Sequence, residues 1–214
     1  MKNLILTILA SAVILIIGAM NAMATEEASY KVLKTSGKFE IREYAPHILA
    51  ETVVDGDLEE AGNKAFRRLF NYISGANQSR AKVAMTAPVS QEKAGEKISM
   101  TAPVVQRAKG DRDYVIAFVL PAALTADTAP APTNPDVELC TIPTSLTAAK
   151  EYGGRWSQSS YERHCAELLD AVATAGLRPV GAPRFARFDP PFKPWFLRRN
   201  EVLVDVEEAS TPTA

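Results

Sequence analysis

The chain has 214 residues, a formal net charge of −1 and 47% hydrophobic residues. This composition fits one globular domain with a sizeable core and argues against a disordered chain. It also lacks the strongly basic balance that is typical of nucleic-acid-binding domains, so we expect no nucleic acid partner.

The N-terminus has the layout of a secretory signal peptide. Lys2 supplies a positive charge, Leu4–Ile17 is almost wholly apolar, and Ala22-Met23-Ala24 is a small-residue cleavage site. We therefore expect residues 1–24 to be removed and the rest of the chain to be exported, to a periplasmic compartment. The alternative is an uncleaved membrane anchor, although the apolar run is shorter than the roughly 20 residues that a spanning helix needs.

The first part of the exported chain is predicted to form two strands and a helix. Tyr30–Glu43 alternates loosely and predicts a strand with a turn or bulge at its glycine, and His47–Asp55 predicts a second strand. Apolar residues in Leu58–Ser74 recur every three or four positions, which predicts a helix with Asp57 as its N-cap.

A five-residue repeat follows this helix. Met-Thr-Ala-Pro-Val occurs at Met85–Val89 and again at Met100–Val104, each time after a short run with strand character. The polar link between the copies predicts neighbouring antiparallel strands, with the prolines at strand ends, edges or bulges because proline cannot donate a ladder hydrogen bond. The alternative is a duplicated hairpin that only supplies core residues.

The remaining chain predicts a second group of strands around a second helix. A surface crossing is expected at Pro121–Pro135, a helix from Ser157 to about Thr174, and a frayed tail from Glu207. The strand candidates are Tyr114–Leu120, Val137–Leu139, Ala148–Tyr152, Pro183–Phe188 and Glu201–Val206. The two halves are alike in outline, which predicts an α+β fold in which each half packs one helix on antiparallel sheet.

The reactive residue types are few. Cys140 and Cys165 could form a disulfide in an exported protein or remain partly buried thiols, and the sequence leaves both open. His47 and His164 are the two histidines, too few for a multi-histidine metal site. The chain contains no nucleophile elbow, zinc-protease motif or phosphate loop, so we expect a protein that is not an enzyme.

Two segments combine aromatic and cationic residues. The predicted first helix contains Lys64, Phe66, Arg67, Arg68, Leu69, Phe70 and Tyr72. The late segment contains Phe192, Lys193, Trp195, Phe196, Arg198 and Arg199. These sets are either ordinary amphipathic surfaces or the walls of a ligand groove.

Four ordered motifs resemble the SOUL / heme-binding protein family, over about Tyr30 to Val206. They are Phe39–Tyr44, Ala65–Asn77, Met85–Val89, and Asp189–Pro191 followed by Arg199–Val202. The resemblance implies a distorted antiparallel β-barrel with two flanking helices, built from two similar halves with a pseudo-two-fold relation. Between the expected signal peptide at 1–24 and a disordered tail at 207–214, it implies a SOUL-like domain at 25–206, and the second repeat and the export signal resemble a bacterial, exported branch of the family.

The resemblance further implies non-catalytic binding of heme or a related tetrapyrrole, for buffering, carriage or scavenging. A porphyrin is a flat apolar plate with two carboxylates on one edge, so it needs an apolar groove with a cationic rim. Arg67, Arg68 and Lys193 are expected to face the propionates. The expected apolar contacts are Phe70, Tyr72, Met85 and Phe192.

The iron ligand is where this chain departs from the family pattern. The family's proposed histidine position is Glu43 here, which leaves His47 as a candidate axial ligand, or else a surface histidine near a turn. Met85 or Met100 could offer a thioether, although methionine in a strand more often fills the core. Relatives without such a histidine imply binding through apolar contacts and basic side chains.

Two other classes of function remain open. The fold expected here is similar to small-molecule sensor domains, so the chain could bind another flat hydrophobic ligand or act as a protein-interaction module. A third alternative is an enzyme that acts on a bound ligand through Glu43 or another buried carboxylate.

Overall fold

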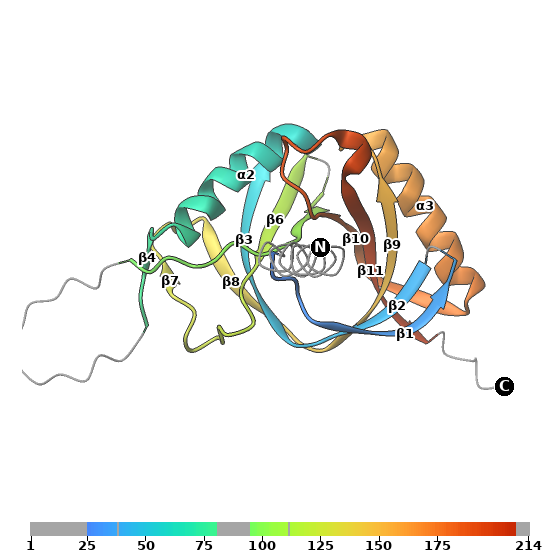
Figure 1. The fold of residues 1–214 in the computed structure, drawn as a ribbon, viewed down its shortest axis with the longest axis horizontal. Helices are drawn as coiled ribbons and strands as arrows, with labels where there is room; N and C mark the ends of the chain where they lie inside the picture. The colour runs from blue at the N-terminus through green and yellow to red at the C-terminus, as the bar shows by residue number, and fades with distance from the viewer. Residues whose placement is uncertain (1–24, 38, 81–94, 111, 209–214) are drawn as a thin grey trace, which may run out of the picture.

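The computed structural model describes residues 25–37, 39–80, 95–110 and 112–208, which adopt an α+β fold with two helices on a large antiparallel sheet (Figure 1). None of the helices in this part of the chain has the length and apolar character to cross a membrane. The elements are β1 (Tyr30–Ser36), β2 (Phe39–Tyr44), β3 (His47–Asp55), α2 (Leu58–Ile73), β4 (Asn77–Gln78), β5 (Val104–Ala108), β6 (Asp113–Val119), β7 (Ala131–Pro132), β8 (Val137–Ile142), β9 (Ser145–Gly153), α3 (Gln158–Thr174), β10 (Leu177–Arg187), the 3₁₀ turn η1 (Trp195–Leu197) and β11 (Arg199–Glu208).

The main sheet has the strand order β1-β2-β9-β11-β10-β5-β6-β3-β8, and β4 pairs separately with β7. The closed barrel is not confirmed. In the described part of the chain the order ends at β1 and β8, which pair with one neighbour each and lie on opposite sides of a strongly curved sheet (Figure 1). A pseudo-two-fold relation between the halves remains a prediction.

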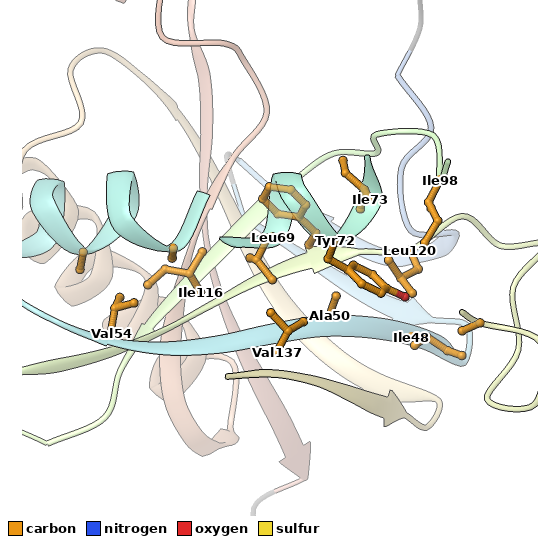
Figure 2. Close-up of a cluster of buried hydrophobic side chains, with 14 residues drawn as sticks. Ile48, Ala50, Val54, Leu69, Tyr72, Ile73, Ile98, Ile116, Leu120 and Val137 are labelled. Atoms are coloured by element: carbon orange, nitrogen blue, oxygen red, sulfur yellow. The ribbon is translucent and has the colours of Figure 1, made fainter. Parts of the chain in front are cut away.

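Helix α2 forms where the apolar spacing predicted it. Ala61, Ala65, Leu69 and Tyr72 are each at most 1% exposed and face strands β3 and β6, as Figure 2 shows for the labelled residues of this cluster. Asp57 caps the helix, because its Oδ1 accepts a 2.8 Å hydrogen bond from the amide of Glu60. The predicted helix is therefore confirmed.

Helix α3 repeats this arrangement in the second half of the chain. Ser157 is its N-cap and accepts a hydrogen bond from the amide of Ser160. Leu168 and Val172 are fully buried and pack on β9, β10 and β11. The helix ends before Gly176, whose φ of +71° suits glycine.

Both helices cover the same face of the sheet. Gln106 on β5 pairs with Ile116 on β6 and with Phe185 on β10, and paired residues point to the same face. Ile116 belongs to the cluster under α2 and Phe185 to the cluster under α3. This is the outer, convex face of the curved sheet, and the opposite, concave face bears its own apolar clusters, which include Val105 and Leu203 (Figure 1).

The prediction of a strand over Met100–Val104 is wrong except for its last residue. The strand begins at Val104, because Pro103 has no amide hydrogen and the amide of Ala102 donates to the carbonyl of Glu26 instead. Glu27 and Ala102 form an isolated parallel bridge there. The first copy of the repeat, including Met85, lies outside the described residues.

Several boundaries also differ from the predictions. Tyr30–Glu43 is two strands, β1 and β2, because the chain turns at Gly37 with a φ of +63°. Strand β10 begins at Leu177, before its first proline, and β11 continues to Glu208 rather than ending at Val206. The last two strands are longer because they pair with each other over most of their length.

The disulfide hypothesis is wrong. Cys140 lies on β8 and packs against the concave-face cluster that contains Val105, whereas Cys165 lies on α3 and packs against the cluster under that helix. Both cysteines are free. The two residues belong to different halves of the sheet.

Candidate functional site

The predicted contact residues of α2 do not share one surface. Phe70 is 46% exposed and stacks on Phe66, with ring centroids 5.8 Å apart. Phe66 also meets the buried ring of Phe118 edge-on, at 5.4 Å. Tyr72, by contrast, is 1% exposed and its hydroxyl donates to the carbonyl of Pro130 at 2.9 Å. It holds α2 in place from inside the core.

The two neighbouring arginines of α2 have different surroundings. Arg68 donates to the carbonyl of Val53 and forms an ion pair with Asp136 at 3.4 Å, so it is held on the flank over β3 and β8. Residues two positions apart lie about 200° apart around a helix, which places Arg68 away from Phe66 and Phe70. Arg67 is exposed and makes no hydrogen bond or ion pair within the described residues.

The loop between β10 and β11 presents apolar side chains from a well-fixed backbone. The carboxylate of Asp189 accepts hydrogen bonds from Lys193 Nζ and from the amide of Arg199, both at 2.6 Å. Arg198 donates to the Lys193 carbonyl and lies 4.2 Å above the ring of Trp156. Lys193 is therefore an internal partner of the loop as well as a rim cation.

Phe192 is 87% exposed, and Phe196 and Leu197 are also well exposed. Figure 1 shows this segment, in red, crossing between the ends of α2 and α3. A Cβ at Gly62 would lie 3.0 Å from Arg187 Nη1, which shows how closely α2 approaches the end of β10. We call the exposed side chains of α2 and this loop the convex apolar set: Phe66, Phe70, Phe192, Phe196 and Leu197.

A cavity of about 160 Å³ lies on the other, concave face. Its floor is formed by side chains of β3, β5 and β6 that point to the sheet face away from the helices. The N-terminal residues Glu27 and Ala28 also line it. The apolar lining includes Leu49, Val105, Val115, Ala117, Val119 and Leu203.

Two ion pairs face this cavity from opposite sides. Arg184 binds Asp205 through two contacts of 2.6 Å, and the hydroxyl of Thr147 donates to the same carboxylate at 2.7 Å. Burial raises the pKa of Asp205, but the hydrogen bonds and charge of Arg184 lower it more, so the pKa lies below its usual value. The pair between Glu51 and Arg107 is longer, at 3.4 Å.

His47 also lines the concave cavity. Its Nδ1 lies 2.9 Å from the carbonyl of Ala45, which can only accept, so Nδ1 carries the proton. The structure therefore places His47 on the opposite face from Arg67, Lys193 and the convex apolar set. Met100 is 42% exposed, and the described residues contain no cluster of three His, Cys, Asp or Glu side chains that could hold a metal.

Apart from His47, the residues of the concave cavity were not predicted from the sequence. One signal was present: His47, Leu49 and Glu51 alternate along one predicted strand and so share a face. The partners of these residues come from distant strands, so the pattern indicated a polar face without indicating a cavity.

The chain belongs to the SOUL heme-binding protein family, which matches residues 25–205. Among named relatives, heme-binding protein 1 of Xenopus tropicalis is 29% identical over 165 residues, 77% of this chain and 81% of the relative. Heme-binding protein 1 of Xenopus laevis is 27% identical over the same shares. The resemblance drawn from the four motifs is thus confirmed.

Solved structures with similar folds are more distant in sequence. The C-terminal domain of EcmrR has a TM-score of 0.58 at 11% identity, covering 84% of this chain and 98% of that domain. A hydrolase from Listeria innocua has a TM-score of 0.51 at 12% identity, covering 82% of this chain and 94% of its own. At these identities the likeness concerns the fold alone.

Proposed function

We propose that this protein binds heme or a related tetrapyrrole, without turnover, at the convex apolar set. The observation that supports this most directly is the β10–β11 loop, which is internally hydrogen-bonded yet leaves Phe192, Phe196 and Leu197 exposed. Exposed apolar groups that adjoin one another on a protein surface are typical of interaction sites. Membership of the SOUL heme-binding protein family supports the choice of ligand.

The two faces differ in how well they suit a tetrapyrrole. The concave cavity, at about 160 Å³, is smaller than the roughly 300–1,000 Å³ typical of pockets that enclose a drug-sized ligand. The convex face instead offers the stacked pair Phe66 and Phe70 and the exposed loop residues, so a flat plate could rest on apolar side chains there. We therefore place the ligand on the convex face.

The polar contacts follow from the same geometry. Arg67 is exposed on α2 next to Phe66 and is the first choice for a propionate partner. Lys193 and Arg68 remain predicted partners, but each would have to share its charge with Asp189 or Asp136. A ligand carboxylate should therefore depend more on Arg67 than on the other two cations.

Heme would bring an iron with two axial positions, and neither histidine belongs to the convex apolar set. His47 lines the concave cavity, and His164 stacks on Tyr152 with ring centroids 4.1 Å apart. Burying about 400 Å² of apolar surface contributes on the order of 10 kcal/mol before the costs of association, which is enough for micromolar binding without an iron–protein bond. This favours buffering, carriage or scavenging over chemistry on the iron.

A hemin titration of the purified protein tests this proposal. We expect saturable binding, and a loss of affinity of about tenfold or more for the double variant Phe66→Ala, Phe70→Ala, because two ring contacts are removed. Leu33→Ala is the matched control, since Leu33 is an equally exposed apolar residue on the edge strand β1. Failure of hemin to bind at tens of micromolar, or equal losses in both variants, would contradict the proposal.

Two further titrations define the ligand. Arg67→Glu should weaken binding, whereas Lys31→Glu on β1 should not, because only Arg67 lies beside the convex apolar set. Metal-free protoporphyrin should bind as well as hemin if the iron is not ligated by the protein. Displacement of hemin by many unrelated planar aromatics would instead favour the alternative of a sensor-like module for another flat ligand.

We also propose that the protein is exported and cleaved after Ala24. The support is the apolar N-terminal segment with its A-x-A site. Intact mass measurement of the protein from a secreting host should give a chain that begins at Thr25, and a retained N-terminus would favour the anchor instead.

A further inference from the structure

The concave cavity plays no part in tetrapyrrole binding as proposed above, yet it is a built feature of the fold. Its mouth is crossed by the N-terminal residues, which are fixed to the protein. The carbonyl of Glu26 accepts a 2.8 Å hydrogen bond from the amide of Ala102, and Glu27 pairs with Arg199 at 2.9 Å. In Figure 1 this blue segment passes inside the curve of the sheet.

One wall of the cavity combines polar and apolar side chains from a single strand. Strand β3 directs His47, Leu49 and Glu51 into the cavity, because alternate residues share a face. The ring of His47 is held at the start of this strand, because its Nδ1 lies 2.9 Å from the carbonyl of Ala45.

Glu51 has acceptor capacity left. Its side chain is 16% exposed, and its contacts are a 3.4 Å approach of Arg107 Nη2 and a 3.6 Å contact with the thiol of Cys140. Charge-assisted hydrogen bonds of a carboxylate are usually about 2.7–2.9 Å long. Glu51 is thus a largely buried carboxylate whose partners are a long ion pair with Arg107 and a thiol, which is a weak donor.

The other charged groups are either better paired or better hydrated. Asp205 is satisfied by Arg184 and Thr147, and Arg107 is 39% exposed and reaches water. Tyr44 lies 6.1 Å from the ring of His47 and adds an aromatic surface at that end. The least closely paired of these buried groups is therefore a carboxylate, and the cavity beside it is lined mostly by apolar and aromatic side chains, with Arg107 and Arg184 among the polar ones.

We propose that the concave cavity is a second binding site, for a small apolar amine. The ammonium group would donate to the carboxylate of Glu51. The apolar body would rest on Leu49, Ala117 and Leu203. The cavity volume limits this ligand to a single small ring or a short branched chain. The site is independent of the proposed tetrapyrrole surface, because it lies on the other face of the sheet.

Three shape-matched probes test the charge preference of the full-length purified protein by calorimetry: cyclohexylamine, cyclohexanol and cyclohexanecarboxylate. We expect the amine to bind at least about tenfold more tightly than the other two, since only the amine carries a positive charge that can pair with the carboxylate of Glu51. Glu51→Gln, which keeps the shape, should remove this preference. Glu43→Gln is the control, because Glu43 is exposed on the opposite face of β2.

A second variant tests the place. Ala117→Leu fills the floor of the cavity and should abolish amine binding, while hemin affinity should stay within twofold of the wild type. Far-UV circular dichroism checks that this variant is folded. The proposal is overturned if the amine does not bind at millimolar concentration, if all three probes bind equally, or if the carboxylate binds best and Arg107→Gln removes it. Hemin affinity that falls in parallel with amine affinity in Glu51→Gln would also overturn it, since the two sites would then not be independent.

Discussion

Glu201 is fully buried and accepts hydrogen bonds from two arginines. Arg42 reaches its two oxygens at 2.7 and 3.1 Å, and Arg199 donates at 2.8 Å. Burial lowers the pKa of Arg42, but the hydrogen bonds and charge of Glu201 raise it more, so it stays protonated. Arg199 also pairs with Glu27, so the network ties strands β2 and β11 to the N-terminal segment.

Glu201→Gln should destabilise the protein by about 3–5 kcal/mol, because it leaves two arginines without their buried counter-charge. Chemical denaturation gives the free energy of unfolding. Glu151→Gln is the matched control: Glu151 pairs with Glu201 in the strand register and also contacts Arg199, but its side chain is 62% exposed. We expect it to change stability by less than about 0.5 kcal/mol, and equal losses would refute the role of burial.

Asp205 provides a pH prediction. Its pKa in the folded protein lies below the usual value of about 3.9 because of Arg184 and Thr147. The pair therefore contributes stability above that pH, and the contribution is lost as the pH falls through the folded pKa. Between pH 6 and pH 3 the free energy of unfolding should fall more steeply for the wild type than for Asp205→Asn. Asp127→Asn, on an exposed loop, should keep the wild-type slope.

Two of the family motifs have a structural role that their sequences did not indicate. Phe39–Tyr44 and Arg199–Val202 were two of the motifs that resembled the family, and the structure joins them through the ion pair between Arg42 and Glu201. Their side chains thus hold strands together. Arg42 and Glu201 are 159 positions apart in the sequence, so no local pattern could predict that they pair.

At the scale of elements, Asn77 holds the end of α2. Its amide nitrogen donates to the carbonyls of Tyr72 and Glu96, and its oxygen accepts from the amide of Glu96, at 2.7–2.8 Å. The side chain is 3% exposed, so water cannot replace these bonds. Residue 96 follows the undescribed segment, and Asn77 therefore fastens the return of the chain to the helix.

Asn77→Ala should cost about 3 kcal/mol of stability, since three hydrogen bonds of roughly 1 kcal/mol each are lost. Gln78→Ala is the control, because Gln78 is the exposed neighbour on the same short strand. Denaturant titration compares the two. A loss of less than about 1 kcal/mol in Asn77→Ala would show that the segment is held by other contacts.

The helices could be predicted from sequence because their signals are local. The spacing of Ala61, Ala65, Leu69 and Tyr72 and the cap at Asp57 determine α2 within a few residues of itself. The structure of the second copy of the repeat, Met100–Val104, could not be predicted from local signals. Whether its residues join a strand depends on which amides find partners, and the partner of Ala102 comes from the N-terminal segment.

At the scale of the molecule, the curvature of one sheet creates two unlike faces. The convex face takes both helices and the exposed loop, and the concave face encloses the cavity. From the sequence alone His47 and Arg67 were expected around one ligand, because local patterns cannot assign residues to the faces of a nine-stranded sheet. Strand order and curvature arise from pairings between distant segments, and both were needed to separate the two candidate sites.

The same separation predicts the behaviour of the thiols. Cys140 and Cys165 lie in different clusters on opposite faces, and burial raises the pKa of both thiols, with Glu51 adding to the shift at Cys140. Since the thiolate is the reactive form, the native protein should react slowly with a thiol reagent at pH 8. Unfolding without reductant should release two equivalents of thiol, and Cys165→Ser should release one. Fewer than two equivalents of thiol from the wild type, or a melting temperature that falls on reduction, would contradict the structure, because either result would mean that Cys140 and Cys165 form a disulfide.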